Sequence, residues 1–273
     1  MLASLITRWH RWMARRQSQH EARMLARRAI PEPLWQLTLA GLPFLAQRSS
    51  ADLAELRRLV SLFLSDKEFS GAAGLEVDDA MAVCIAAQAC LPVLRFGLGP
   101  YRGVMSIVVH PDEALARREV TDEHGIVHCY DEQLTGEAMA GGPVMLSWVD
   151  ASGAGESAEW GYNVVIHEFA HVLDMGDGQA DGVPPLPGAA ERAAWIAVIT
   201  PAFAQLCSQV DAGQTTLIDP YGSTSIDEFF AVSVETFFTQ PKALRAEHPD
   251  LYGLLARYFL QDPAAFQAPA GSG

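Results

Sequence analysis

The chain has few of the features that define several large classes of protein. Its four cysteines are scattered, a distribution that fits neither a disulfide framework nor a cysteine-based zinc site. We interpret them as reduced thiols of a cytoplasmic protein: Cys84, Cys90, Cys129 and Cys207. No uninterrupted apolar run reaches the ~18 residues of a transmembrane helix, and no internal repeat is visible. We therefore expect a globular chain without a transmembrane segment.

Positive charge is scarce and unevenly placed. The chain has 19 lysines and arginines against 33 aspartates and glutamates, a formal net charge of −14. Residues 1–30 hold seven arginines and one glutamate, so this arm carries +6 and the remainder −20. Such an acidic body repels phosphate, which argues against direct nucleic-acid binding by it.

The basic arm allows two interpretations. Residues 8–16 could form a basic amphipathic helix that binds a membrane surface or an acidic partner. Alternatively, the arm is a solvated helix that folds against its own acidic body. A cleaved signal peptide is not expected, because the apolar stretch of residues 2–6 is shorter than the required ~7–15 residues.

Composition and periodicity predict one α+β domain. A chain of 273 residues with 49% hydrophobic content can bury a sizeable core. We expect a basic arm over 1–30, a single domain over 31–262 and a disordered tail over 263–273. The patterns predict helices at about 51–65 (capped by Ser50), 77–91, 160–175, 189–211, 225–239 and 249–260, and strands at 105–109, 125–130 and 144–149.

One pentapeptide, His167-Glu168-Phe169-Ala170-His171, indicates chemistry. Positions i and i+4 of a helix share a face, so His167 and His171 can bind one metal ion. Glu168 between them can reach a water on that ion and accept its proton, as in zinc peptidases. The alternative is that two surface histidines lie on an ordinary helix.

The surrounding residues support a helix. Val165, Phe169 and Val172 form an apolar stripe on a different side from the histidines. Gly176 follows the last apolar residues, where we expect the helix to end in a left-handed residue. The loop 176–187, rich in Gly, Pro and Asp, should lie at the rim of a cleft.

A third protein ligand must lie elsewhere in the chain. Asp174 and Asp177 stand where a metzincin needs Gly and His, so that class is excluded. Asp174 lies about 10 Å along the axis from His167, which suits a hydrogen bond to a ligand imidazole better than metal ligation. Glu191 has the spacing of the thermolysin ligand but lacks that family's flanking residues.

Glu228 is the better candidate. Glu228 and Glu235 share one face of a helix that is otherwise rich in phenylalanine, and buried carboxylates need a partner or a metal. A second interpretation remains open: Ser225 and Glu228 also match a capping box, in which Glu228 folds back on the helix start.

Together these segments resemble the Mlc titration factor A family, glucose-regulated bacterial zinc peptidases whose catalytic core is similar to that of anthrax lethal factor. The likeness covers roughly residues 30–262. It rests on five segments: His167–Met175, Gly182 with the following Val-Pro, Asp227–Val232 with a second Glu at 235, Leu91–Leu94 and Leu146–Asp150. The resemblance implies a zincin-like fold with a mixed sheet, an active-site helix and an N-terminal helical part.

The resemblance also implies functional residues. His167, His171 and Glu228 would bind one Zn²⁺ per chain, and Glu168 would be the general base. Tyr221 matches the family tyrosine seven residues before the ligand glutamate and could stabilise an oxyanion, although it could equally be a packed loop anchor. Glu235, with Asp174, could orient a ligand imidazole.

Two functions follow as expectations. The first is aminopeptidase-like hydrolysis of peptide or protein substrates, with binding to a sugar-responsive transcriptional repressor. The second is a non-catalytic regulator that sequesters a repressor and keeps a structural or vestigial zinc site. Glu168 argues mildly against the second, because a purely structural site does not need it.

Two further predictions concern the strands. In zinc peptidases of this type, the strand ahead of the motif helix is an edge that pairs with substrate, and residues 144–149 hold that place in the sequence. His124 and His128 would share a face of a strand but stand about 13 Å apart, so we do not expect them to bind one ion.

Overall fold

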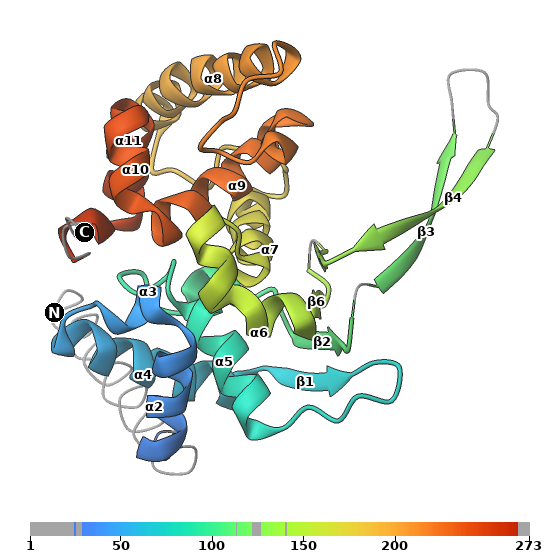
Figure 1. Ribbon diagram of the computed structural model, residues 1–273, viewed down its shortest axis with the longest axis vertical. Helices are drawn as coiled ribbons and strands as arrows, with labels where there is room; N and C mark the ends of the chain where they lie inside the picture. Colours follow the sequence, from blue (N-terminus) through green and yellow to red (C-terminus); the bar gives the residue numbers. More distant parts are fainter. Residues whose placement is uncertain (1–24, 26–28, 113, 122–126, 140, 267–273) are drawn as a thin grey trace, which may run out of the picture.

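The computed structural model describes residues 25, 29–112, 114–121, 127–139 and 141–266. The predicted arm over 1–30 lies almost wholly outside the described residues, as do His124 and the chain after Phe266. The described chain is a mixed α+β domain with a small sheet among many helices (Figure 1).

The main sheet has four strands in the order β1-β2-β6-β5. Strands β1 (Glu68–Gly71), β2 (Ser106–His110) and β6 (Val144–Ser147) are parallel, and β5 (Gly136–Ala138) pairs with β6 in the antiparallel direction. The predicted mixed sheet is therefore confirmed. Buried side chains lie opposite one another across β2 and β6, with Ile107 beside Val144 and Val109 beside Leu146.

The prediction that residues 144–149 form the edge strand is wrong. β6 lies between β2 and β5, and it ends at Ser147, whose side chain accepts a hydrogen bond from the Asp150 N–H and so starts helix α6 (Trp148–Ser157). The edge strand on this side of the sheet is the short strand β5, and β1 forms the opposite edge. A long excursion of the chain between β2 and β6 supplies this extra strand.

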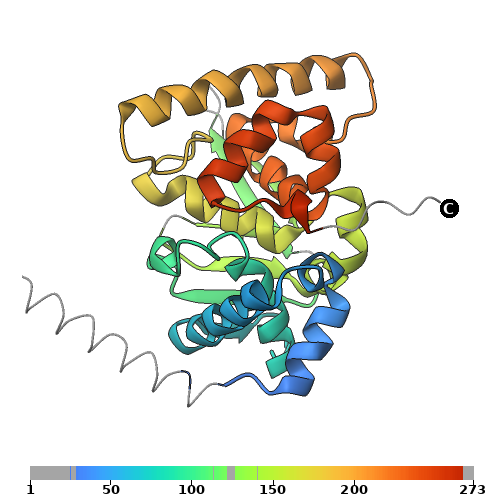
Figure 2. The ribbon, with the colours of Figure 1, turned by 90° about the vertical axis from the view of Figure 1, so that its left-hand side faces the viewer.

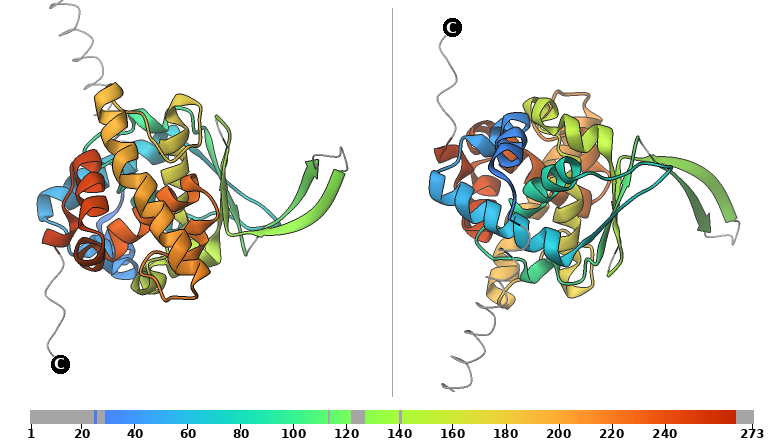
Figure 3. Two further views of the ribbon diagram at one scale, coloured as in Figure 1. Left: turned by 90° about the horizontal axis from the view of Figure 1, so that it is seen from above. Right: turned by 90° about the horizontal axis from the view of Figure 1, so that it is seen from below.

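That excursion also contains a two-stranded hairpin of β3 (Ala114–Thr121) and β4 (Val127–Leu134). The hairpin projects from the body of the domain and leads directly into β5 (Figures 1 and 3). The strand predicted at 125–130 corresponds to β4, whose described part begins at Val127.

The N-terminal half contributes four helices: α2 (Glu32–Gly41), α3 (Pro43–Ala46), α4 (Ser50–Asp66) and α5 (Asp79–Cys90). In Figure 2, α2, α4 and α5 lie below the sheet. These confirm the two helices predicted at 51–65 and 77–91. The cap of α4 is Ser49 rather than Ser50, because the Ser49 side chain accepts the Asp52 N–H. Of the cysteines whose side chains are described, none is in a disulfide.

The C-terminal half lies above the sheet in the same view (Figure 2). It contains α8 (Ala189–Asp211), α9 (Ile226–Thr239) and α11 (Pro249–Phe259), which lie close to the predicted ranges. A further helix, α10 (Pro241–Glu247), was not predicted. A 3₁₀ turn, η5 (Pro263–Ala265), follows with Ala264 buried. A turn with a buried residue thus lies within residues 263–273, which were expected to be a disordered tail.

Helix α8 bears on the expectation that no segment spans a membrane. Among the described residues it is the one helix long and apolar enough to do so by length and composition. Length and composition of a single helix are weak evidence for a membrane span. Here three side chains of α8 are buried against the rest of the domain: Trp195, Ile199 and Leu206.

Candidate metal centre

The motif lies on helix α7 (Val164–Asp174), whose start is set by Asn163. The Asn163 side chain accepts the Ile166 N–H, and this cap begins the helix four residues later than the predicted 160. The preceding residues form a 3₁₀ turn, η2 (Ala158–Trp160), that ends at left-handed Gly161. At the other end the left-handed residue is Gly178, not the predicted Gly176, because a second 3₁₀ turn, η3 (Met175–Asp177), extends the helix.

The apolar face of α7 packs into the core as predicted. Val165 and Phe169 are fully buried, and the Phe169 ring contacts the rings of Phe63 and Tyr101 at centroid distances of 5.7 and 4.8 Å. These edge contacts fix the rotation of the helix and leave the histidine face toward α9.

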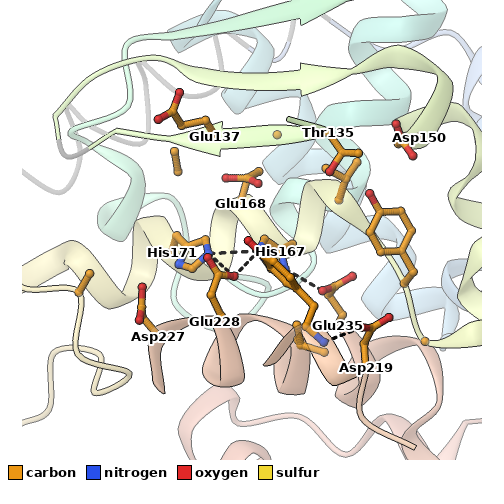
Figure 4. Close-up of a pocket in the computed structure, with 18 of the residues that line it drawn as sticks. Thr135, Glu137, Asp150, His167, Glu168, His171, Asp219, Asp227, Glu228 and Glu235 are labelled. Atoms are coloured by element: carbon orange, nitrogen blue, oxygen red, sulfur yellow. Dashed lines mark hydrogen bonds and ion pairs between the residues drawn. The ribbon is translucent and has the colours of Figure 1, made fainter. Parts of the chain in front are cut away.

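Three side chains converge between α7 and α9 (Figure 4). The Nε2 atoms of His167 and His171 are 3.1 Å apart, and Glu228 Oε2 lies 3.0 and 3.3 Å from them. In a tetrahedral site with bonds of about 2.0–2.1 Å, ligand atoms stand about 3.3 Å from one another. Glu228 Oε2 is also buried and lacks a well-formed hydrogen bond. This donor set fits a single metal ion.

The structure does not show the two alternatives, a Glu228 side chain folded back in a capping box and Glu191 as the third ligand. Ser225 does cap α9 by accepting the Glu228 N–H, but the Glu228 side chain lies against the histidines instead of folding back. Glu191 lines a different cavity, away from the histidines. A thermolysin-like ligand set is therefore not assembled.

Glu168 lies beside the cluster in a buried position. Its side chain is 5% exposed, and burial raises the pKa of its carboxyl to about 7. Across from it is Gly136 of the edge strand: a Cβ atom there would come within 2.5 Å of Glu168 Oε1. The absence of a side chain at 136 is thus what makes room for the carboxylate.

Glu235 holds one histidine from behind. Its Oε1 is 2.8 Å from His167 Nδ1, and its Oε2 accepts the backbone N–H of Asn163. A proton on Nδ1 leaves the Nε2 lone pair facing the centre. Glu235 is 2% exposed, and burial raises the pKa of its carboxyl.

Asp174 does something different from what was expected. Among the described residues no hydrogen bond joins it to His171; its Oδ2 accepts the Gly182 N–H at 2.9 Å, and its Oδ1 has no partner. It therefore ties the end of α7 to the loop that follows. Burial raises the pKa of Asp174 to about 6.

Tyr221 lies on the 3₁₀ turn η4 (Pro220–Ser223) at the mouth of the cleft. Its ring centroid is 6.2 Å from that of His167, and its side chain is 53% exposed. Such exposure does not favour the role of a packed loop anchor.

A known protein family accounts for nearly the whole chain. The family described as the glucose-regulated metallo-peptidase M90 matches residues 12–260. The chain belongs to this family. The match begins well before residue 30, where the resemblance was expected to start, so it includes much of the basic arm.

Relatives in this peptidase family have similar length. An uncharacterized Synechocystis protein is 37% identical over 255 residues, which are 92% of this chain and 90% of that protein. The Mlc titration factor A of Edwardsiella ictaluri is 33% identical over 226 residues, 82% of this chain and 85% of the relative. That of Pectobacterium atrosepticum is 32% identical over 234 residues, 85% and 87% of the two chains.

As a member of this family the chain is metallopeptidase-like, and its cleft contains residues that the sequence did not reveal. The cleft has a volume of about 730 Å³, and no lysine or arginine is among the described residues that line it. Seven residues with carboxyl groups line it. Three of them, Glu168, Glu228 and Glu235, were predicted site residues, and the other four were not: Glu137, Asp150, Asp219 and Asp227. Tyr162 also lines it, with a buried hydroxyl that has no well-formed hydrogen bond to the described residues.

Asn163 was also missed. Besides capping α7 it binds Glu235 through its N–H and donates from Nδ2 to Gln88 Oε1 at 2.9 Å. The signal was available, since an asparagine directly before an apolar helix is a typical N-cap.

The contact between Gly136 and Glu168 gives a prediction. Gly136→Ala should push the carboxylate out of place and lower kcat of the metal-loaded protein on the order of 10²-fold, with metal content unchanged. Gly153→Ala is the matched control, because a Cβ at that half-buried helical position meets no atom within 4 Å. Steady-state kinetics and metal analysis are measured on both variants. Equal activity of Gly136→Ala and Gly153→Ala would contradict the steric argument.

Proposed function

We propose that the protein is a zinc-dependent, aminopeptidase-like hydrolase of peptide bonds. The observation that carries the proposal is the convergence of His167, His171 and Glu228 beside a buried Glu168. Two imidazoles and one carboxylate, with room for a water, form the ligand set typical of catalytic zinc. Membership of a metallo-peptidase family supports the same class.

Each residue of the site then has a task. Zinc, when bound, acts as a Lewis acid that polarises the substrate carbonyl and acidifies a water. Glu168 accepts the proton of that water and returns it to the leaving amine. Glu235 holds the His167 ring by its Nδ1–H, and Tyr221 supplies a phenol to the developing oxyanion.

The edge strand suits an extended substrate. One side of β5 is paired with β6, while residues 136–138 line the cleft. A peptide could therefore add to β5 by main-chain hydrogen bonds. Pairing with an extended substrate, which was expected of residues 144–149, is therefore proposed for β5.

Hydrolysis of alanine anilide by the purified protein tests the proposal. Activity should disappear with a chelator and return when Zn²⁺ is added back. An N-acetylated alanine anilide provides the control for aminopeptidase action, because it lacks the free amino group. If the protein hydrolysed neither anilide nor longer peptides in a chelator-sensitive way, the enzymatic proposal would be refuted.

Removal of the Tyr221 hydroxyl gives another prediction. Tyr221→Phe should lower kcat on the order of 10²-fold at unchanged metal content, since the ring stays and the oxyanion partner is lost. Tyr162→Phe serves as the comparison, because Tyr162 also lines the cleft. Activity of Tyr221→Phe within a few-fold of wild type would show that the phenol has no catalytic task.

A second candidate function rests on the relatives called Mlc titration factor A. We propose that this chain also binds a sugar-responsive transcriptional repressor, in the cytoplasm. Co-purification with such a repressor tests this directly. If Glu168→Gln binds the repressor normally yet lacks hydrolysis, the two functions are separable; a chain that binds but never hydrolyses is a regulator alone.

A further inference from the structure

A second cavity, of about 820 Å³, lies against helix α7 away from the metal ligands. Val172 and Leu173 of α7 line it, together with the loop that ends in Pro187 and parts of α8 and α11. Most of its wall is apolar, including Phe96, Leu173, Trp195, Leu254 and Tyr258. The volume falls in the range of about 300–1,000 Å³ that small-molecule sites occupy.

The charges on this cavity are unusual for the molecule. Arg102 and Arg257 both line it, with Glu191 as its one carboxylate. Among the lysines and arginines whose side chains are described, these two are the ones with no hydrogen bond or ion pair to another described residue. The others are engaged, for example Arg57 with Glu32, Arg95 with Asp52 and Arg192 with Asp181. In a chain of net charge −14, two unpaired cations beside one apolar cavity make it locally attractive to anions.

We propose that this cavity binds a small amphipathic anion, an apolar chain or ring system that carries a carboxylate, sulfonate or phosphate group. The apolar wall would bury the body of the ligand, and the exposed guanidinium groups of Arg102 and Arg257 would bind its head by charge-assisted hydrogen bonds. This site is separate from the peptidase cleft and does not depend on the proposed hydrolysis.

The position of the cavity makes such a ligand relevant to the metal centre. Val172 directly follows His171, so the bound molecule would touch the helix that carries two ligands. The loop after α7 also borders both spaces, with Met175 and Ala180 in the cleft and Gly176 and Pro185 in the second cavity.

Calorimetry on the full-length, metal-loaded chain tests the proposal with three probes that share a ten-carbon chain, each used below its micellar concentration or solubility limit. The probes are 1-decanesulfonate, 1-decanol and decyltrimethylammonium; the sulfonate is chosen because it is a poor metal ligand. We expect saturable binding of one decanesulfonate per chain, at least about 10-fold tighter than decanol. The cation should bind more weakly than the alcohol.

Two pairs of variants locate the binding. Replacing both Arg102 and Arg257 by Gln should reduce decanesulfonate affinity to that of decanol, whereas Arg58→Gln, remote on α4, should not. Ala194→Trp should obstruct the cavity and weaken binding of both probes at least about 10-fold, whereas Ala193→Trp, one residue away and outside the cavity, should leave binding intact.

Three outcomes would overturn the proposal. Decanesulfonate could bind no tighter than decanol, or Ala194→Trp could leave its binding unchanged. Sedimentation could instead show a concentration-dependent dimer that Ala194→Trp disrupts and Ala193→Trp does not, which would assign the surface to a second copy of the chain.

Discussion

Glu168→Gln should lose about 10²–10⁴-fold in kcat while it keeps its metal. The amide has the shape of the carboxylate and fills the same space against Gly136, so packing should persist. It can neither accept a proton from water nor return one to the leaving amine. Metal analysis and alanine anilide hydrolysis on the same preparation measure both halves of the prediction.

Asp150→Asn is a suitable control for Glu168→Gln, because Asp150 lines the same cleft but lies outside the ligand set. It should retain activity within about 10-fold of wild type. If Glu168→Gln hydrolysed the substrate at a near-normal rate, Glu168 would not be the general base, whatever the metal content.

Glu228→Gln should weaken zinc binding by more than about 100-fold, beyond the 10–100-fold typical of residues that only orient a ligand. Glu228 Oε2 is the atom placed 3.0 and 3.3 Å from the two histidine nitrogens, and an amide oxygen offers the ion no negative charge. Competition with a fluorescent zinc chelator measures the change in dissociation constant.

Glu191→Gln is the matched control for Glu228→Gln. It changes the same group on a residue that lines the other cavity, so zinc affinity should stay nearly normal. The reverse pattern, with loss in Glu191→Gln and retention in Glu228→Gln, would replace the ligand set by a thermolysin-like one.

The motif helix was predictable because local spacing determines it. His167 and His171 share a face wherever a helix forms, and the apolar positions Val165 and Phe169 make that helix certain to pack. Glu228 could not be fixed by spacing, since its distance from α7 depends on how α9 folds back. From the sequence alone, two alternatives stayed open: Glu191 as the third ligand, and Glu228 as part of a capping box.

The edge strand escaped prediction for a different reason. Residues 136–138, Gly-Glu-Ala, have neither apolar alternation nor β-branched side chains, so no pattern marks them as a strand. These residues contribute backbone groups that pair with β6, and the missing side chain at Gly136 leaves room for Glu168. The need for glycine at 136 arises only from the approach of Glu168, a tertiary contact.

The two parts of the candidate metal site assemble by different routes along the chain. His167 and His171 come together as soon as one helix forms, whereas Glu228 lies beyond the 23-residue helix α8 and reaches them only when α9 docks on α7. Closing so long a loop is slow and entropically costly, and helix–helix docking must compensate for it. A chain that is truncated before α9, or in which α9 is undocked from α7, therefore keeps the whole motif of residues 167–171 but lacks Glu228 beside the two histidines.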